Sequence, residues 1–394
     1  MSKNIVAITG NDAAAYAIKQ INPDVMAAYP ITPQTALVQK FSEYVADGLV
    51  KTEFVTVESE HSAMSACVGA SAAGGRVMTA TAANGLALMF EIVYIAASSK
   101  LPIVMPVVNR ALSGPINIHC DHSDSMAARD SGWIQIYSES AQEAYDNLIQ
   151  AIKIAENMKV RLPVMVMYDG FITSHGIEMA DFLNDDTVSK FIGDYQPNYP
   201  LLDPEKPLTY GPLDLYDYYF EHKRQQAEDI KNSKPIILEV AKQFKEISGR
   251  EYGLFESYQL EDAETAIVAL SSTAGTAKAA VDELRARGKK VGLLKPRIFR
   301  PFPYIEIAEA LSHLKAVAIL DRSDSFGAFG GPLFTEIRSA MMEFGKIPEN
   351  IDVIYGLGGR DINQEDISSI YDQLDDIVKT GKVKERIQYF GVRE

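Results

Sequence analysis

Cysteine and positive charge are both scarce in this sequence. Its two cysteines, Cys67 and Cys120, are too few for a disulfide framework or for a cysteine-ligated iron–sulfur cluster. With 38 basic against 53 acidic residues, the net charge of −15 argues against nucleic acid as a partner. No apolar run reaches the roughly 18 residues of a membrane-spanning helix, and the N-terminus lacks the layout of a signal peptide. We therefore expect a cytoplasmic protein with no membrane partner.

The common self-contained catalytic motifs are also missing. No Gly-x-Gly-x-x-Gly fingerprint follows a predicted strand. No Gly-Lys-Ser/Thr phosphate loop, His-Glu-x-x-His or Gly-x-Ser-x-Gly sequence occurs either. An enzyme built on this chain therefore needs a less regular site, or a site that another chain completes.

Strand and helix patterns nevertheless alternate regularly along the 394 residues. Short apolar runs such as Ile5–Ile8 and Val164–Tyr168 are typical of buried strands in a parallel sheet, and longer helical segments separate them. The pattern predicts an α/β protein with two doubly wound, mostly parallel sheets, one in residues 1–181 and one in residues 263–394. A long arm rich in proline and tyrosine, with one helix, joins them over residues 182–262.

The first candidate site lies where the predicted strand Val25–Ala28 ends. Pro30 and Pro33 follow, and each disfavours helical backbone in the residue before it, so Thr32 is expected to be extended. Open α/β sheets bind ligands at the carboxyl ends of their strands. On these residues alone, a stiff strand-to-helix turn without a ligand is an equally good interpretation.

Three further strand ends carry candidate residues. Glu58 and Glu60 open an alanine-rich helix, where they either stabilise its N-terminus or hydrogen-bond a ligand. Asn84 and Gly85 form either a tight turn or a surface that a flat ring can approach closely. Arg110 suits bidentate binding of a carboxylate, and an ordinary ion pair is the alternative.

A polar loop from Gly114 to Gly132 contains His119, Asp121, His122 and Asp124. Histidine and aspartate are metal-ligand types, so a metal hydrolase that uses His119, Asp121 and His122 is one hypothesis. Because no second ligand pair occurs elsewhere, we prefer a polar loop that closes over a site.

Taken together, these motifs resemble the α subunit of pyruvate:ferredoxin oxidoreductase (pyruvate synthase), in the 2-oxoacid:ferredoxin oxidoreductase family. The matching segments, which extend over nearly the whole chain, are Tyr29–Pro33, Glu58–Glu60, Asn109–Ser113, Asp121–Trp133, Tyr168–His175 and Arg297–Pro303. The resemblance implies a thiamine diphosphate-binding domain of the pyrimidine type in residues 1–181. It implies a transketolase C-terminal-like domain in residues 263–394.

The resemblance also implies a reaction and a set of partners. Enzymes of this family, in anaerobic metabolism, convert pyruvate and coenzyme A reversibly to acetyl-CoA, CO2 and reduced ferredoxin. Thiamine diphosphate would be shared with a β subunit, whereas Mg2+ and 4Fe-4S clusters would lie in partner subunits, with β, γ and δ chains completing the enzyme. The scarcity of cysteine and the lack of a Gly-Asp-Gly diphosphate motif agree with an α chain that is inactive alone.

By the same resemblance, Glu60 is the catalytic glutamate that hydrogen-bonds the aminopyrimidine ring and drives its imino tautomer. Glu58 is the alternative if the register differs by two residues. Asn84 and Gly85 lie in the turn against the cofactor.

Thr32 and Arg110 match the residues that bind the substrate carboxylate, and His122 and Asp124 lie on the loop over the site. One short hydroxyl and one arginine suit a small monoacid, which favours pyruvate. Another 2-oxoacid, a metal hydrolase and a scaffold that only binds are the alternatives.

Overall fold

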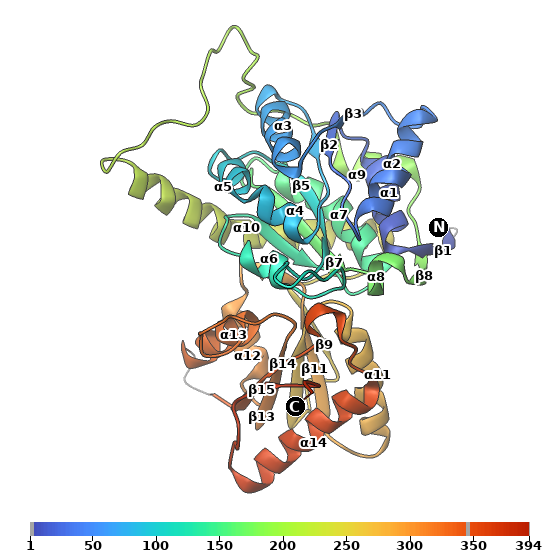
Figure 1. Cartoon of the computed structure of the whole chain (residues 1–394), viewed down its shortest axis with the longest axis vertical. Coiled ribbons are helices and arrows are strands. Elements are labelled where there is room, and N and C mark those ends of the chain that lie inside the picture. The colour runs from blue at the N-terminus through green and yellow to red at the C-terminus, as the bar shows by residue number, and fades with distance from the viewer. Residues whose placement is uncertain (1–3, 344–346, 394) are drawn as a thin grey trace.

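Two large sheets lie one above the other in the computed structural model, which describes residues 4–343 and 347–393 (Figure 1). The upper sheet has seven strands and the lower has six, and most neighbouring strands in both are parallel. The predicted fold class, an α/β protein with mostly parallel sheets, is confirmed.

The upper sheet consists almost entirely of strands from the first half of the chain. In spatial order they are β12 (Ile298–Arg300), β6 (Ile134–Tyr137), β7 (Val164–Asp169), β5 (Val104–Asn109), β4 (Val77–Met78), β2 (Val25–Ala28) and β3 (Glu53–Thr56). Every residue of β5, β6 and β7 is buried, which explains their continuous apolar sequences, because a strand covered on both faces has no polar side.

Helices cover both faces of this sheet. They are α1 (Gly10–Ile21), α2 (Thr35–Ala46), α3 (Glu60–Ala73), α4 (Ala83–Leu88), α5 (Phe90–Ser98), α6 (Ser123–Ala127), α7 (Ala141–Ala155), α8 (Ile172–His175) and α9 (Asp185–Ile192). The apolar sides of α1, α2 and α7 belong to one core cluster, and those of α3 and α5 belong to another. The buried strands therefore lie between two helical layers.

The first predicted strand does form, but it does not join the upper sheet. β1 (Ile5–Thr9) pairs antiparallel with β8 (Ile177–Asp181) in a separate two-stranded ribbon. No residue of β1 is fully buried, and half of Ile5 is exposed. If β1 lay in the middle of the parallel sheet, Ile5 would be buried.

The lower sheet is built from the second half of the chain. Its order is β15 (Ile387–Tyr389), β14 (Glu349–Ile354), β13 (Ala316–Asp321), β10 (Thr265–Ala269), β11 (Val291–Pro296) and β9 (Phe255–Tyr258), with only β9 antiparallel to its neighbour. Helices α11 (Thr273–Ala286) and α14 (Gln364–Thr380) pack on one face, and α12 (Tyr304–Leu311) and α13 (Pro332–Glu343) pack on the other. A short 3-10 turn, η1 (Leu357–Gly359), follows β14.

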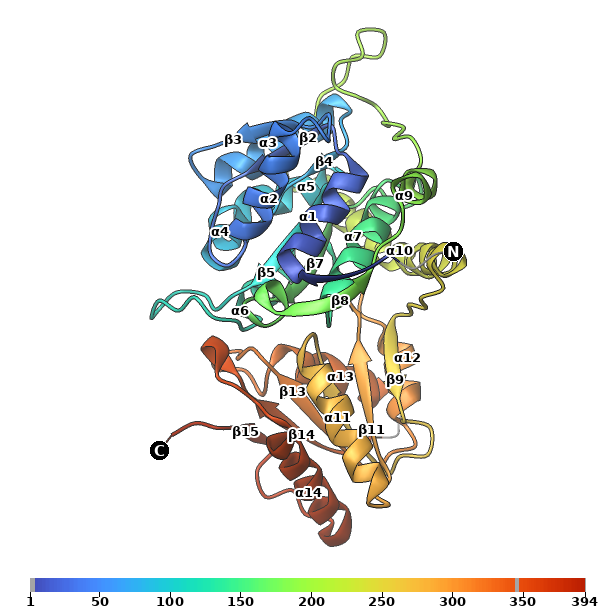
Figure 2. The ribbon, with the colours of Figure 1, turned by 90° about the vertical axis from the view of Figure 1, so that its right-hand side faces the viewer.

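One strand from the second half of the chain and a common core join the two sheets. β12, from the second half of the chain, pairs antiparallel with β6 at the edge of the upper sheet. Phe299 of this strand is fully buried in a cluster that contains residues of both sheets. Figure 2 shows the upper and lower bodies stacked along the long axis.

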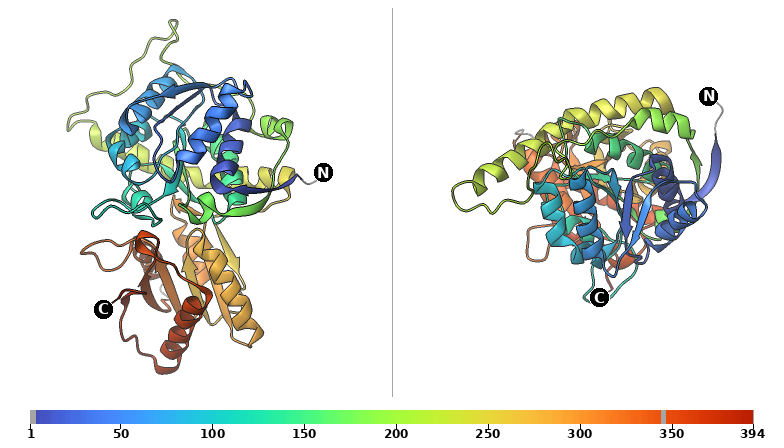
Figure 3. Two further views of the ribbon diagram at one scale, coloured as in Figure 1. Left: turned by 45° about the vertical axis from the view of Figure 1, so that its right-hand side comes forward. Right: turned by 90° about the horizontal axis from the view of Figure 1, so that it is seen from above.

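The arm between the two sheets leaves the body of the protein. After α9 an irregular stretch loops outward, and the chain returns through the long helix α10 (Tyr219–Ser248), which crosses one side of the upper body (Figure 3). The buried residues of α10 lie in its second half, where Ile237, Val240 and Phe244 join the core. Its first half and the preceding loop are largely exposed.

Candidate active site

The site is built where the strands of the upper sheet end. β5 and β7 are neighbours, so their last residues, Asn109 and Asp169, lie side by side. The turn after β2 carries Thr32, and Arg110 directly follows β5. The carboxyl ends of parallel strands share one edge, so residues distant in sequence are brought together here.

Arg110 is buried and bonds main-chain oxygens. Its guanidinium donates from Nη1 to the carbonyl of Thr32 at 2.9 Å and from Nε to the carbonyl of Asn117 at 2.8 Å. Only 6% of Arg110 is exposed. Within the described residues no carboxylate pairs with this guanidinium, so the ordinary ion pair is not what the structure contains. A buried cation without an anion favours an anionic ligand, because an unpaired charge is costly to bury.

Thr32 lies beside this arginine, in the predicted turn. It precedes Pro33, and its own side chain is exposed. Arg110 contacts the main chain of Thr32, so the hydroxyl remains free to face a ligand. The structure thus places side by side the two residues that the family resemblance assigns to the substrate carboxylate.

Asp124 fixes the backbone around Arg110. Its carboxylate accepts hydrogen bonds from the amides of Ala83 at 2.9 Å and Arg110 at 3.0 Å, and from Asn109 Nδ2 at 2.7 Å. Burial raises the pKa of Asp124 to about 6, although these hydrogen bonds oppose that rise. Asp124 was expected on a loop over the site; it lies instead inside the protein, where it joins the ends of two strands.

Glu60, Thr81 and Gly85 form a small polar cradle. Glu60 is the first residue of α3 and is 6% exposed. A Cβ atom at Gly85 would lie 2.7 Å from Glu60 Oε1 and 2.5 Å from Thr81 Oγ1, so any larger residue there would displace these two side chains. The Thr81 hydroxyl is buried and has no hydrogen-bond partner among the described residues. A hydroxyl that can still form hydrogen bonds, next to the Glu60 carboxylate, suits a planar ligand with hydrogen-bonding edges.

Glu58 and Asn84 lie at the edges of this cradle. Glu58 is at the surface, and the hydrogen bond from Ser62 lowers its pKa. Asn84 is exposed, and its Oδ1 accepts hydrogen bonds from the amide and hydroxyl of Ser113, each at 3.1 Å. Of the two glutamates, only Glu60 is buried. Asn84 binds the neighbouring loop through its hydrogen bonds with Ser113.

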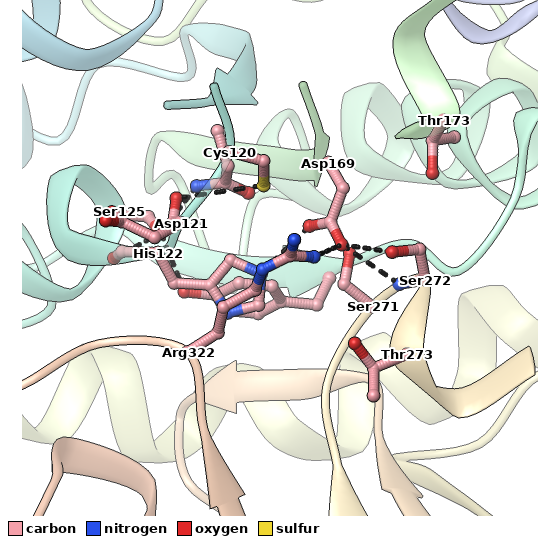
Figure 4. Close-up of polar contacts among 12 residues, drawn as sticks. Cys120, Asp121, His122, Ser125, Asp169, Thr173, Ser271, Ser272, Thr273 and Arg322 are labelled. Atoms are coloured by element: carbon pink, nitrogen blue, oxygen red, sulfur yellow. Dashed lines mark hydrogen bonds and ion pairs between the residues drawn. The ribbon is translucent and has the colours of Figure 1, made fainter. Parts of the chain in front are cut away.

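His122 joins the upper and lower sheets instead of covering an open site. Figure 4 shows its ring beside Asp169, with Nε2 2.8 Å from Asp169 Oδ1, and both residues are buried. Across the boundary, Arg322 at the end of β13 donates to Asp169 Oδ2 at 3.0 Å, and the amide of Ser272 lies 3.3 Å from the same oxygen. Burial alone raises the pKa of Asp169, but the charges of His122 and Arg322 outweigh it and hold that pKa well below its usual range.

A metal site in this loop is not supported by the ligand geometry. Within the described ranges, the ligand group nearest to the prediction is Cys120, His122 and Asp169, without His119. Arg322 already neutralises Asp169, and burial raises the pKa of the Cys120 thiol well above its ordinary value. Both Asp121 oxygens are occupied, because they accept from Ser123 and from the amide of Gly358.

A second candidate metal site consists of three acids, Glu139, Glu143 and Glu256, but the ammonium group of Lys295 already lies among them. Lys295 Nζ lies 2.7 Å, 2.6 Å and 2.9 Å from their carboxylates.

Comparisons with known proteins show the family to which this chain belongs. Residues 16–242 match the model of a family described as pyruvate flavodoxin/ferredoxin oxidoreductase, thiamine diphosphate-binding, and residues 263–367 match pyruvate:ferredoxin oxidoreductase core domain II. A pyruvate synthase subunit PorA of Thermotoga maritima is 58% identical over 389 residues, which are 99% of this chain and 98% of the relative. The chain belongs to the pyruvate:ferredoxin oxidoreductase family.

Other members of this family are also similar. PorA of Methanocaldococcus jannaschii is 49% identical over 94% of this chain and 95% of its own length. A ketoisovalerate oxidoreductase subunit VorA of Pyrococcus horikoshii is 43% identical over 98% of each chain. Because the relatives are named as subunits, a pyruvate:ferredoxin oxidoreductase of this type consists of several chains.

Solved structures support the fold. A 2-oxoglutarate:ferredoxin oxidoreductase from Magnetococcus marinus superposes with a TM-score of 0.71 at 21% identity, covering 94% of this chain and 65% of that protein. A split-gene transketolase superposes with a TM-score of 0.57 at 13% identity, covering 94% and 98% of the two chains. In the described ranges no helix has both the length and the apolarity to cross a membrane.

Several residues of the site were not predicted from the sequence. These residues are Thr81, Arg322 and Ser272. Arg322 and Ser272 each follow a strand of the lower sheet, as Arg110 follows one of the upper. A search for polar residues after every predicted strand would have found them.

Proposed function

We propose that this chain is the α subunit of a pyruvate:ferredoxin oxidoreductase, or pyruvate synthase. The reaction converts pyruvate, coenzyme A and two oxidised one-electron ferredoxins to acetyl-CoA, CO2 and two reduced ferredoxins, with release of a proton. The observation that carries this proposal is the buried guanidinium of Arg110, which lies beside the main chain of Thr32 and pairs with no carboxylate of the described residues. Full-length relatives named pyruvate synthase subunits support it.

Arg110 and Thr32 would bind the substrate. The guanidinium pairs with the carboxylate of the 2-oxoacid, and the Thr32 hydroxyl donates a hydrogen bond to the same group. A site with one cation and one short hydroxyl accepts a monoacid, whereas a second carboxylate would need another cation. Asp124 positions Arg110 by holding its amide at 3.0 Å.

The cradle of Glu60, Thr81 and Gly85 fits the aminopyrimidine ring of thiamine diphosphate. Because Gly85 has no side chain, the Glu60 and Thr81 side chains lie directly against its backbone. The Glu60 carboxylate and the Thr81 hydroxyl, which has no hydrogen-bond partner among the described residues, would offer hydrogen bonds to the ring. When bound, thiamine diphosphate supplies the nucleophilic carbon and the electron sink that decarboxylation of a 2-oxoacid requires. Glu60 would place its carboxyl group against a ring nitrogen of the cofactor and would support proton transfer at that atom through a hydrogen bond.

The remaining parts of the enzyme would come from other chains in the cytoplasm. A β subunit would bind the diphosphate and Mg2+, and 4Fe-4S clusters in partner subunits would carry electrons to ferredoxin. The two cysteines of this chain are both buried, Cys67 in α3 and Cys120 in the loop before α6, which supports this division.

Reconstitution tests the proposed function. The isolated chain should contain no stoichiometric iron or zinc and should not oxidise pyruvate. Together with its partner subunits, thiamine diphosphate and Mg2+, it should reduce ferredoxin when pyruvate and coenzyme A are added. Pyruvate oxidation by the isolated chain, or a stoichiometric metal ion in it, would contradict the assignment.

Branched 2-oxoacids are a second candidate substrate class, because a ketoisovalerate oxidoreductase subunit is 43% identical over almost the whole chain. Competition between pyruvate and 2-oxoisovalerate in the same assay separates the two candidates.

A further inference from the structure

The arm presents a continuous apolar segment to solvent. From Leu213 to Phe220, six of eight residues are large and apolar or aromatic, and all six are exposed: Leu213, Leu215, Tyr216, Tyr218, Tyr219 and Phe220. Tyr216 is 91% exposed and Leu213 is 89% exposed. Single exposed apolar residues are normal, but contiguous patches of this kind mark interaction sites. We call Leu213–Phe220 the docking segment.

The chain on either side of the docking segment is held against the protein. On the N-terminal side, the amide of Leu201 donates to the carbonyl of Ala72 at 2.7 Å, which fixes the arm to the end of α3. On the C-terminal side, Asp229 of α10 forms an ion pair of 2.8 Å with Lys100 after α5. The docking segment thus projects from two anchored ends, beyond the upper body (Figures 1 and 3).

A groove runs beside the docking segment. It has a volume of about 590 Å³ and is lined by the segment, the end of α5 and the start of α10, including Ile95, Tyr210, Leu213, Tyr219 and Gln226. The segment and the groove together offer both a projection and a recess. Such a surface suits a partner that packs on both sides of the arm.

Charge narrows the choice of partner. Between residues 194 and 222 the arm carries six acidic residues and one lysine. A membrane with anionic lipids would repel it. A second copy of this chain is also disfavoured, because each copy has a net charge of −15.

We propose that the docking segment inserts its apolar side chains into a groove, edged by lysine and arginine, on another subunit of the same enzyme. The subunit names of the relatives show that such enzymes have other chains. The exposed acid between the aromatic residues, Asp217, would face the basic edge, whereas Asp214 already pairs with His222. This proposal does not depend on which 2-oxoacid is the substrate.

Assembly of the co-expressed enzyme tests the proposal. The triple variant Leu213→Ser, Tyr216→Ser and Phe220→Ser should raise the dissociation constant of this chain from the complex by at least about a hundredfold. Met158→Ser, at an exposed apolar residue outside the arm, is the matched control and should leave assembly unchanged. Asp217→Lys should weaken assembly more at low salt than at high salt. Unchanged assembly of the triple variant would overturn the proposal.

Crosslinking identifies the occupant without relying on that variant. A photoreactive phenylalanine analogue in place of Tyr216, in the purified complex, should form a crosslink to another subunit near lysine or arginine residues. A crosslink only to a second copy of this chain, or none at all, would contradict the proposal. In the triple variant, the complexes that do assemble should have normal specific activity. This measurement separates a failure of the docking proposal, which concerns assembly, from a failure of the proposed function, which concerns activity.

Discussion

The guanidinium of Arg110 lies 2.9 Å from the carbonyl oxygen of Thr32, although 78 positions separate the two residues in the sequence. The contact places the only two groups that we assign to the substrate carboxylate on one edge of the upper sheet. Because Arg110 is buried and no carboxylate in the described ranges pairs with it, its charge is available to a ligand.

Replacement of Arg110 tests this role. Arg110→Met should lower kcat/KM for pyruvate by about ten- to a hundredfold, which corresponds to the roughly 1.5–3 kcal/mol of a charged hydrogen bond. Arg129→Met changes a partly exposed arginine nearby that bonds the carbonyl of Met126 at 2.7 Å, and it serves as the control. If the two variants have the same kcat/KM in steady-state ferredoxin reduction, Arg110 does not bind the substrate.

The choice between Glu60 and Glu58 can be decided by matched substitutions. Glu60→Gln replaces the carboxyl group of the cradle with an amide and should lower kcat by about 10²–10⁴-fold, as expected for loss of a group that moves a proton. Glu58→Gln should have little effect, because Glu58 is exposed and contacts Ser62. Near-normal kcat in Glu60→Gln, together with a strongly lowered kcat in Glu58→Gln, would show that Glu58 is the catalytic glutamate.

The lower sheet should influence substrate binding through Gly358. Its carbonyl accepts from Asn117 Nδ2 at 3.0 Å, and the carbonyl of Asn117 accepts from Arg110. Gly358 has φ +62, and a Cβ atom there would lie 2.5 Å from Asn117 Nδ2. Gly358→Ala should therefore displace the loop that holds Arg110 and raise KM for pyruvate several-fold, with a smaller change in kcat.

Gly381 provides the control for that experiment. It has a similar φ of +66, but a Cβ atom there would meet nothing within 4 Å. Both alanine variants should lose about 1–2 kcal/mol of stability from left-handed backbone. Only Gly358→Ala should change KM, and an equal KM for the two variants would show that the contact does not position Arg110.

The buried Asp169 should make stability depend on acid pH. Its folded pKa is held below the unfolded value of about 3.9, so its ionised form stabilises the fold above that pH. The contribution is lost as the pH falls below about 4 towards the folded pKa. Asp169→Asn should lower the unfolding free energy at neutral pH by roughly 3 kcal/mol, since it leaves Arg322 buried without its anion.

Urea unfolding at several pH values measures this effect. The difference in unfolding free energy between the wild type and Asp169→Asn should be constant at higher pH and should shrink as the pH falls from about 4 to lower values. A difference that stays constant across this range would mean that Asp169 is not ionised against His122 and Arg322.

The local parts of the fold were predictable, and the long-range parts were not. The continuous apolar sequence of Val164–Tyr168 predicted a buried parallel strand, because burial on both faces removes polar alternation. The equally apolar Ile5–Ile8 was misplaced in the sheet, since its sequence does not reveal that it pairs with Ile177–Asp181. Likewise, nothing local to Ile298–Arg300 shows that it leaves the lower body to pair with β6.

The candidate site likewise contains residues that the sequence identifies and residues that only the folded structure brings together. Thr32, Glu60 and Arg110 each follow a strand, so strand ends and the family resemblance were enough to name them. Asp169 and Arg322 meet across 153 positions, and only the packing of two sheets defines that pair.

The most direct test of the central claim is substrate-dependent ferredoxin reduction by the complete complex. With thiamine diphosphate, Mg2+ and coenzyme A present, we expect the highest kcat/KM for pyruvate, with lower values for 2-oxoisovalerate and 2-oxoglutarate. Acetyl-CoA and CO2 should form in equal amounts, with two reduced one-electron ferredoxins for each. Preference for another 2-oxoacid, or turnover without thiamine diphosphate, would contradict the account.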